Sequence, residues 1–209
     1  MSRILFITSK PYFPWEGACH RIRHDLEALI ALGHTVDLLT VPVGTPPDVS
    51  GVHLLPIPRI PFCRQLPEGP SAHRFVLDIL MFFKAVFHSG RNPYTLIHGI
   101  DDGGVIAWLA GSLTKTPCVF ERHSGLSRAS IKGLRRLWLG IYRFLERRAL
   151  KKSDVVIGSD TSTIELLSRF GRRSRACVIP DIPAVTEEVT LPARNLAQAR
   201  YRTAPDQIL

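Results

Sequence analysis

Short apolar runs recur along the chain, and most of them precede a longer segment with helical periodicity. Runs of this length are typical of buried parallel strands, whereas spaced apolar positions predict amphipathic helices. The predicted strands are Ile4–Thr8, Thr35–Thr40, Val52–Pro56, Leu96–His98, Cys118–Phe120, Val155–Ile157 and Cys177–Ile179. The predicted helices are Ala18–Leu32, Ala72–Phe87, Gly104–Leu113, Leu126–Lys152 and Ser162–Phe170. This alternation predicts an α/β domain with a doubly wound, mostly parallel Rossmann-like sheet and helices on both faces.

Two stretches depart from the alternation. Val41–Pro70 is rich in proline and glycine, so it is predicted to be mostly loop around one short strand. After Ile179 the apolar pattern gives way to polar sequence, although Asp206–Leu209 resembles the beginning of a strand. A length of 209 residues suits one domain with some excess. We therefore predict a Rossmann-like domain over residues 1–183, followed in 184–209 by a linker and the start of another domain.

The loops that follow the strands are the places to look for function. In doubly wound sheets, ligands bind outside the carboxyl ends of the strands, where the strand order reverses. Three loops in such positions carry unusual chemistry, namely Ser9–Gly17, Gly99–Gly104 and Glu121–Gly125.

The first of these loops ends in Glu16 and Gly17, directly before a predicted helix. A glycine there allows the backbone to approach a phosphate closely, and the helix amino terminus supplies free N–H groups and a positive dipole. A simple turn before a helix explains the same glycine, and the G-x-G-x-x-G and P-loop patterns are both absent. His20 and His24 share a helix face, but no third ligand accompanies them, so no metal site is predicted.

Acidic residues and a histidine follow the two central strands. Asp101 and Asp102 are candidates for binding sugar hydroxyls or acting as a base, and capping of the next helix is the structural alternative. Glu121 and His123 would lie on one side and Arg122 on the other if their strand continues, because side chains alternate along a strand. A buried structural role is the alternative for His123, whose position after a strand favours contact with a ligand.

The net charge of +9 arises from one segment. Between Arg122 and Lys152 there are ten basic residues and one acidic residue, Glu146. The basic face of the predicted helix comprises Arg128, Lys132, Arg135, Arg136, Arg143, Arg147 and Lys151, interrupted by Leu139 and Leu150. The apolar face, predicted to pack on the sheet, comprises Leu134, Leu137, Trp138, Ile141, Tyr142, Phe144, Leu145 and Ala149.

Two interpretations fit this helix. An ordinary surface helix has the same pattern, and so has a helix that meets an anionic membrane, where each basic residue contributes about 1 kcal/mol. Nucleic acid is not predicted as a partner, because no aromatic platform or known nucleic-acid module accompanies the basic residues.

Other features of the sequence suggest a cytoplasmic protein. The first apolar run begins at Ile4, which leaves no room for a secretory leader. The longest apolar run, Phe75–Phe87, includes Asp78 and Lys84 and is shorter than the roughly 20 residues of a bilayer span. The four cysteines are scattered and are interpreted as reduced thiols. The predicted location is the cytoplasm, with peripheral contact to the inner face of the membrane through the basic helix.

Several stretches together resemble the amino-terminal, acceptor-side domain of family-4 glycosyltransferases of the GT-B type, over residues 3–183. The resemblance is carried by Ile4–Thr8 with Pro11, Pro14 and Gly17, and by Leu29–Val36, Leu96–Gly99, Thr116–His123, Leu145–Ser159 and Val178–Pro180. Leu145–Ser159 is the most specific of these stretches. Two positions depart from the family: Gly17 stands alone where a glycine pair is usual, and Asp181-Ile182 replaces Asn-Gly.

The resemblance implies one half of a GT-B fold. It also implies retaining, metal-independent transfer of a sugar from a nucleotide-diphosphate donor to an acceptor, without a cofactor. Gly17, with Glu16 beside it, would face the donor phosphates, and His123 would contact the transferred sugar. The donor-binding residues of the family lie in a second, carboxy-terminal domain, so the domain by itself is expected to be inactive.

The alternative hypothesis is a standalone Rossmann-like module whose basic helix docks on an anionic membrane or a partner. The two hypotheses differ in whether a second domain completes the site. Neither identifies the donor or the acceptor.

Overall fold

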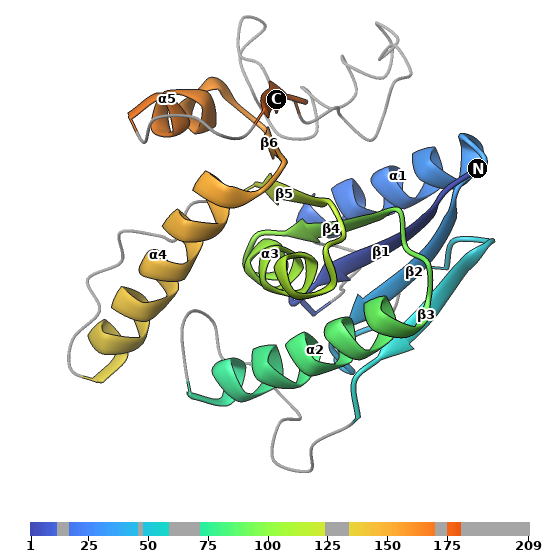
Figure 1. Cartoon of the computed structure of the whole chain (residues 1–209), viewed down its shortest axis with the longest axis horizontal. Helices are drawn as coiled ribbons and strands as arrows, with labels where there is room; N and C mark the ends of the chain where they lie inside the picture. Colours follow the sequence, from blue (N-terminus) through green and yellow to red (C-terminus); the bar gives the residue numbers. More distant parts are fainter. Residues whose placement is uncertain (12–16, 46–47, 59–71, 124–133, 170–174, 181–209) are drawn as a thin grey trace, which may run out of the picture.

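The computed structural model describes residues 1–11, 17–45, 48–58, 72–123, 134–169 and 175–180. This part of the chain forms one sheet whose strands are connected mostly through helices (Figure 1). The strands are β1 (Arg3–Thr8), β2 (Thr35–Thr40), β3 (Val52–Pro56), β4 (Leu96–Ile100), β5 (Cys118–Arg122), β6 (Val155–Gly158) and β7 (Arg175–Val178). The helices are α1 (Gly17–Ala31), α2 (Ala72–Arg91), α3 (Asp102–Thr114), α4 (Leu134–Lys152) and α5 (Thr161–Arg169). Glu16, Arg128, Lys132 and the predicted linker 184–209 lie outside the described residues.

The sheet is doubly wound. Its strands are parallel in every described pairing, and their order is β3-β2-β1-β4-β5-β6-β7. The order reverses between β1 and β4, where Thr8 pairs with Ile100. The loops after these two strands therefore leave the same edge of the sheet side by side, at the switch point where such folds bind ligands. The predicted fold class is confirmed.

Alternation along the central strands builds a separate hydrophobic core on each face. Leu5 and Ile7 of β1 pack with Leu77 of α2 on one face. Phe6 packs with Ile22 of α1 on the other. Figure 1 shows α1 and α2 on opposite sides of the sheet, so helices cover both faces as predicted.

Two glycines allow the first turn of α3 to approach the sheet very closely. A Cβ atom on Gly103 would lie 2.4 Å from the carbonyl oxygen of Ile7, and one on Gly104 would lie 2.6 Å from the Phe120 ring. Contacts this short leave no room for a side chain. The close approach holds Asp101 and Asp102, which directly precede these glycines, at the switch point.

The strands β4 and β5 each extend two residues beyond their predicted ends. Ile100 and Glu121 were expected in loops, but they pair in register within the sheet. The backbone pairing between β4 and β5 continues beyond the apolar residues of each strand. The prediction ended both strands too early because it stopped where the apolar residues stop. As a result, Glu121 lies inside the sheet and is buried.

The helix α4 packs through a face that coincides only in part with the one predicted. Leu137 and Phe144, which were assigned to the packed face, are 60% and 57% exposed. Among the side chains of α4 that the structure describes, Leu139, Tyr142, Ala149 and Leu150 are buried, and of these Tyr142 and Ala149 were predicted to pack. Leu139 and Leu150 had been treated as interruptions of the basic face, but contact with α3 and the sheet selects the stripe that contains them. Leu137 and Phe144 stay on the surface, where Arg136, Arg147 and Lys151 are also exposed.

Candidate functional site

A salt bridge spans the switch point. Lys10, two residues after β1, places its Nζ 2.6 Å from Oδ2 of Asp101, the residue after β4. The other oxygen of Asp101, Oδ1, accepts a 3.0 Å hydrogen bond from the backbone N–H of His123. One carboxylate therefore joins the ends of β1, β4 and β5.

This role differs from helix capping, the structural alternative considered for Asp101 and Asp102. The residue occupies the N-cap position of α3, but its side chain makes no capping hydrogen bond. Its backbone has φ 48° and ψ −114°, a conformation that residues with a side chain rarely adopt. The backbone N–H of Asp101 donates to the Glu121 carbonyl at 2.8 Å, which helps to hold this conformation. Strained backbone of this kind often marks functional sites.

Glu121 is the centre of a buried hydrogen-bond cluster on the α1 face of the sheet. Its Oε1 accepts hydrogen bonds from Nη2 of Arg21 at 2.9 Å and from Nε2 of His123 at 2.8 Å. Its Oε2 lies 2.7 Å from Nε2 of His98 on β4. The Glu121 side chain is 2% exposed, so these partners replace water almost completely. Charge-assisted hydrogen bonds of this kind are among the strongest in proteins.

The cluster sets the charge of its members. Burial by itself raises the pKa of Glu121, but hydrogen bonds from His123 and His98 outweigh burial and bring the pKa well below its usual range. Burial lowers the pKa of His123, but the hydrogen bond and negative charge of Glu121 outweigh it and leave the pKa raised. The pair therefore favours a carboxylate beside an imidazolium.

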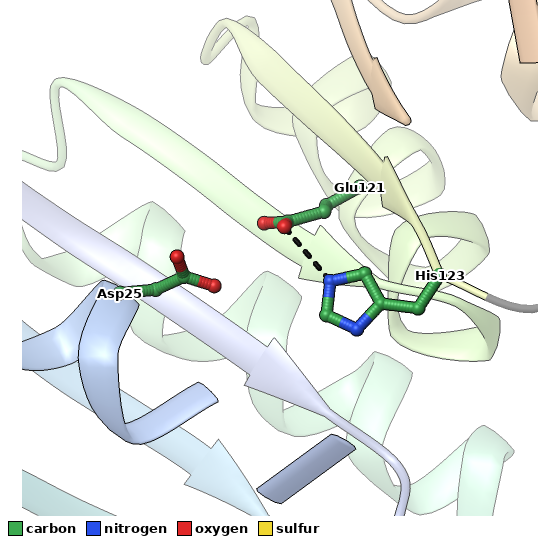
Figure 2. A group of neighbouring side chains, drawn as sticks. All are labelled: Asp25, Glu121 and His123. Atoms are coloured by element: carbon green, nitrogen blue, oxygen red, sulfur yellow. Dashed lines mark hydrogen bonds and ion pairs between the residues drawn. The ribbon is translucent and has the colours of Figure 1, made fainter. Parts of the chain in front are cut away.

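His123 is positioned as a hydrogen-bond donor. Its Nε2 is engaged by Glu121, and the other ring nitrogen points away from that carboxylate (Figure 2). A protonated ring would present an N–H group at this second nitrogen. The predicted shared side of Glu121 and His123 is confirmed, and Arg122 turns to the opposite side, where it pairs with Glu146 at 3.3 Å.

The sequence matches the family described as Glycosyl transferase 4-like domain over residues 16–181, well over half of its length. The chain belongs to this family. This membership confirms the resemblance to family-4 glycosyltransferases. No curated protein matches the sequence.

Solved structures of GT-B glycosyltransferases share the fold of this domain. Sucrose-phosphate synthase from Thermosynechococcus elongatus has a TM-score of 0.67 and 19% identity, with coverage of 99% of this chain and 54% of that chain. Arabidopsis thaliana UGT89C1 complexed with quercetin has a TM-score of 0.58 and 16% identity, with coverage of 96% and 55%. Phytolacca americana UGT2 complexed with UDP-2fluoro-glucose and pterostilbene has a TM-score of 0.56 and 11% identity, with coverage of 90% and 55%. The glycosyltransferase 4-like domain thus spans about half the length of these chains.

Asp25 of α1 completes the polar cluster of the glycosyltransferase 4-like domain. Its carboxylate points toward Glu121 and His123 in Figure 2, and one atom from each of the three residues lies within 4.8 Å of the others. Burial and the charge of Glu121 raise the pKa of Asp25 to about 6. Such a set could offer three ligands to a metal ion. However, Arg21 already donates to the same Glu121 oxygen and would repel a cation, so metal-free chemistry remains our expectation.

Sequence reasoning missed four members of this site: Lys10, Arg21, Asp25 and His98. Lys10 stands two residues beyond the end of β1, and His98 was the last residue of the predicted fourth strand, so the general rule for ligand positions could have found both. Arg21 and Asp25 are four residues apart on α1, so they share a helix face, and their side chains lie 3.5 Å apart. Nothing in the local sequence distinguishes that face from the exposed pair Arg23 and Glu27.

The other predicted site residues are distributed around the switch point. Asp102 begins α3 and forms a 2.7 Å ion pair with Arg74 of α2, and burial raises its pKa. Gly17 begins α1 with open space where a Cβ would stand, so its predicted approach to a phosphate stays a prediction.

Of the predicted basic face of α4, Arg136, Arg147 and Lys151 are exposed, and Arg143 is partly buried. The side chain of Arg135 lies outside the described residues.

None of the helices in the described ranges combines the length and the apolar character needed to cross a bilayer.

Proposed function

We propose that this domain is the acceptor-side half of a glycosyltransferase that moves a sugar from a nucleotide-diphosphate donor to an acceptor. Family membership supports the sugar transfer, and the polar cluster at the switch point supports the position of the site. UGT2 from Phytolacca americana, which shares the fold, binds UDP-2fluoro-glucose and pterostilbene, in line with a nucleotide sugar and an acceptor as partners. A second, donor-binding domain would complete the site.

The observation that carries this proposal is the charged pair of Glu121 and His123. Because Glu121 favours the imidazolium form, the outward N–H of His123 would donate to an oxygen of the transferred sugar or of the departing phosphate. Fixed donors aimed at developing negative charge stabilise a transition state by several kcal/mol. With this positive charge and Arg21 close together, the site has no need of a metal ion. We propose a retaining reaction in keeping with the family resemblance.

The test uses the full-length protein with a panel of nucleotide sugars, with transfer and donor hydrolysis as readouts. His123→Ala is expected to reduce kcat at least about 100-fold, as loss of a transition-state donor does elsewhere. His20→Ala is the matched control, because His20 lies exposed on α1. Activity of His123→Ala at the level of the control would remove the proposed site. NMR of the product anomer tests retention, and activity in excess EDTA tests metal independence.

We further propose that the exposed side of α4 meets an anionic membrane surface. Leu137 and Phe144 are exposed there together with Arg136, Arg147 and Lys151, so apolar and basic groups share one surface. Amphipathic surfaces of this kind bind the bilayer interface through apolar burial and attraction to anionic lipid. A standalone docking module is not favoured, because the family match and the polar cluster both support sugar transfer.

Flotation with vesicles tests this surface. Binding to vesicles with 30% phosphatidylserine is expected to exceed binding to neutral vesicles and to weaken with salt. Phe144→Ser is expected to reduce binding several-fold, whereas Leu113→Ser, an equally exposed site on α3, should leave it unchanged. Equal binding of both variants would contradict the assignment to α4.

A further inference from the structure

An apolar cavity lies on the face of the sheet opposite the polar cluster, between α2, α3 and α4. Its volume is about 160 Å³. Figure 1 shows the three helices beside one another, with α3 between α2 and α4. The cavity is lined mainly by Phe75, Ile79, Phe82, Val105, Leu109 and Leu145. An engineered protein cavity of about this volume binds a benzene ring, so this one has room for a single six-membered ring.

The lining of the cavity includes a carboxyl group, and one oxygen of this group accepts no hydrogen bond from the described residues. Asp78 of α2 lines the cavity and accepts a short hydrogen bond from the hydroxyl of Tyr142 through Oδ2. Its Oδ1 is shielded from solvent and has no hydrogen-bond partner in the described part of the chain. A buried polar atom without a partner costs about 1–3 kcal/mol, so such atoms usually serve a ligand, a water or a proton.

The charge of Asp78 responds to this environment. Burial raises its pKa to about 7, although the Tyr142 hydrogen bond opposes the rise, and the nearby negative charge of Asp102 adds to it. Arg74, paired with Asp102, is the cation that acts on the group from its own helix. The carboxyl is thus poised between its two protonation states near neutral pH, and a donor brought to Oδ1 would stabilise the charged state.

We propose that this cavity binds the apolar, ring-sized end of the acceptor and that a hydroxyl on the ring donates a hydrogen bond to Oδ1 of Asp78. The identity of this ligand as the acceptor rests on the proposed function. The chemical class is a phenol or a similar hydroxylated ring: the mainly apolar lining disfavours a free sugar, and the one unpaired oxygen of Asp78 selects one donor.

Two consecutive residues stand between the cavity and the polar cluster. Asp102 lines the cavity, and Asp101, directly before it, holds the backbone of His123. A molecule bound by its ring could therefore extend around the first turn of α3 toward His123. The acceptor would bridge the two faces of the sheet at the switch point.

Phenol and toluene are the probes, because they share a ring and differ by the donor. Calorimetric or NMR titration of the chain is expected to show phenol binding about tenfold more tightly than toluene. Asp78→Leu is expected to remove this preference, because it removes the acceptor atom while keeping the branched shape of the side chain. Equal affinities of the two probes for the unaltered chain would overturn the proposal.

A second variant keeps the test decisive if Asp78→Leu fails to fold. Ile79→Trp would fill the cavity from its partly exposed rim, and it should abolish the binding of both probes. Val76→Trp is the matched control, since Val76 lies on α2, is 49% exposed and is outside the lining. Phenol binding that survives Ile79→Trp would show that the ligand sits elsewhere.

The acceptor role is separated from binding by assays on the full-length protein. If phenol binds as expected but sugar transfer to any phenol is absent, the cavity stands and its role as an acceptor site is wrong. If Ile79→Trp transfers sugar to phenolic acceptors as well as Val76→Trp does, the acceptor role is overturned while the proposed glycosyltransferase function stands.

Discussion

Two shielded carboxyl groups on opposite faces of the sheet behave in opposite ways. Glu121 accepts hydrogen bonds from Arg21, His98 and His123, and its pKa is brought well below the usual range. Asp78 has one hydroxyl donor and an unpaired oxygen, and its pKa rises to about 7. Burial taken alone would raise the pKa of both groups, so the opposite outcomes come from their partners.

The difference shows what decides the charge of a buried acid. Desolvation disfavours the carboxylate everywhere, and only donors or positive charges can reverse its effect. Where α1 supplies a guanidinium, and β4 and the residue after β5 each supply an imidazole, the carboxylate persists and orients His123. Where α2, α3 and α4 supply mostly apolar groups, the carboxyl remains poised to take a proton or a ligand.

Removal of the Glu121 charge should have the largest effect. In Glu121→Gln the amide N–H₂ would face a donor, and Arg21 would lose the nearer of its two charged partners. Breaking a buried ion pair costs about 3–5 kcal/mol, so the free energy of unfolding in urea should fall by that amount at pH 7. The exposed Glu165→Gln on α5 is the control.

The same variant has a predicted pH dependence. Because the folded pKa of Glu121 lies below its unfolded value of about 4.3, its stabilisation is complete above that pH and is lost as the pH falls through the folded pKa. The difference between Glu121→Gln and the unaltered chain should therefore shrink in acid. A difference that stays constant between pH 7 and pH 3 would contradict the charged state assigned to Glu121.

The close approach of α3 supports both regions, and Gly103→Ala should disturb them together. The added Cβ would meet the Ile7 carbonyl at 2.4 Å, and overpacking of this kind costs about 1–3 kcal/mol. Both phenol binding and sugar transfer should weaken, because Asp101 and Asp102 directly precede this turn. Gly17→Ala, with open space around it, should leave the stability within about 0.5 kcal/mol. A fully stable Gly103→Ala would refute the close packing.

Asp78→Asn should change the pH dependence of stability in the direction opposite to Glu121→Gln. The folded pKa of about 7 exceeds the unfolded value of about 3.9, so the ionised Asp78 destabilises the fold increasingly as the pH rises from 4 to 7. Relative to the unaltered chain, the variant should gain about 1–2 kcal/mol between pH 5 and pH 8. Urea unfolding at the two pH values measures this gain, and Asp48→Asn, exposed before β3, should show none.

The smallest expected effect is on the titration of His123. Its raised pKa depends on the hydrogen bond and charge of Glu121, so Glu121→Gln should lower the pKa of His123. The charged imidazole stabilises the fold below the unfolded pKa of about 6.5, and this contribution is lost as the pH rises through the folded pKa. NMR titration of the ring protons measures the shift. An unchanged His123 titration would mean that Glu121 does not set its charge.

Sequence periodicity was sufficient for the elements of this fold, because buried strands and amphipathic helices have strong periods of their own. It also placed Glu121, His123 and Asp101 near one another, since the carboxyl ends of parallel strands meet at one edge. It identified only part of the packed face of α4, because the helix has apolar groups on more than one side and only its neighbours choose among them. It could not separate Arg21 from Arg23, which differ only in the direction they face.

The sequence by itself thus determined the family, the doubly wound sheet and the edge where the site lies, because these follow from local patterns and from topology. Tertiary structure alone decided which donors surround each shielded acid. Arg21 and Glu121 are 100 residues apart in the chain, and Asp78 and Tyr142 are 64 residues apart. Charge and hydrogen bonding depend on distances of a few ångströms, which no local pattern contains. The opposite ionisation of the two acids is therefore a property of the packed molecule.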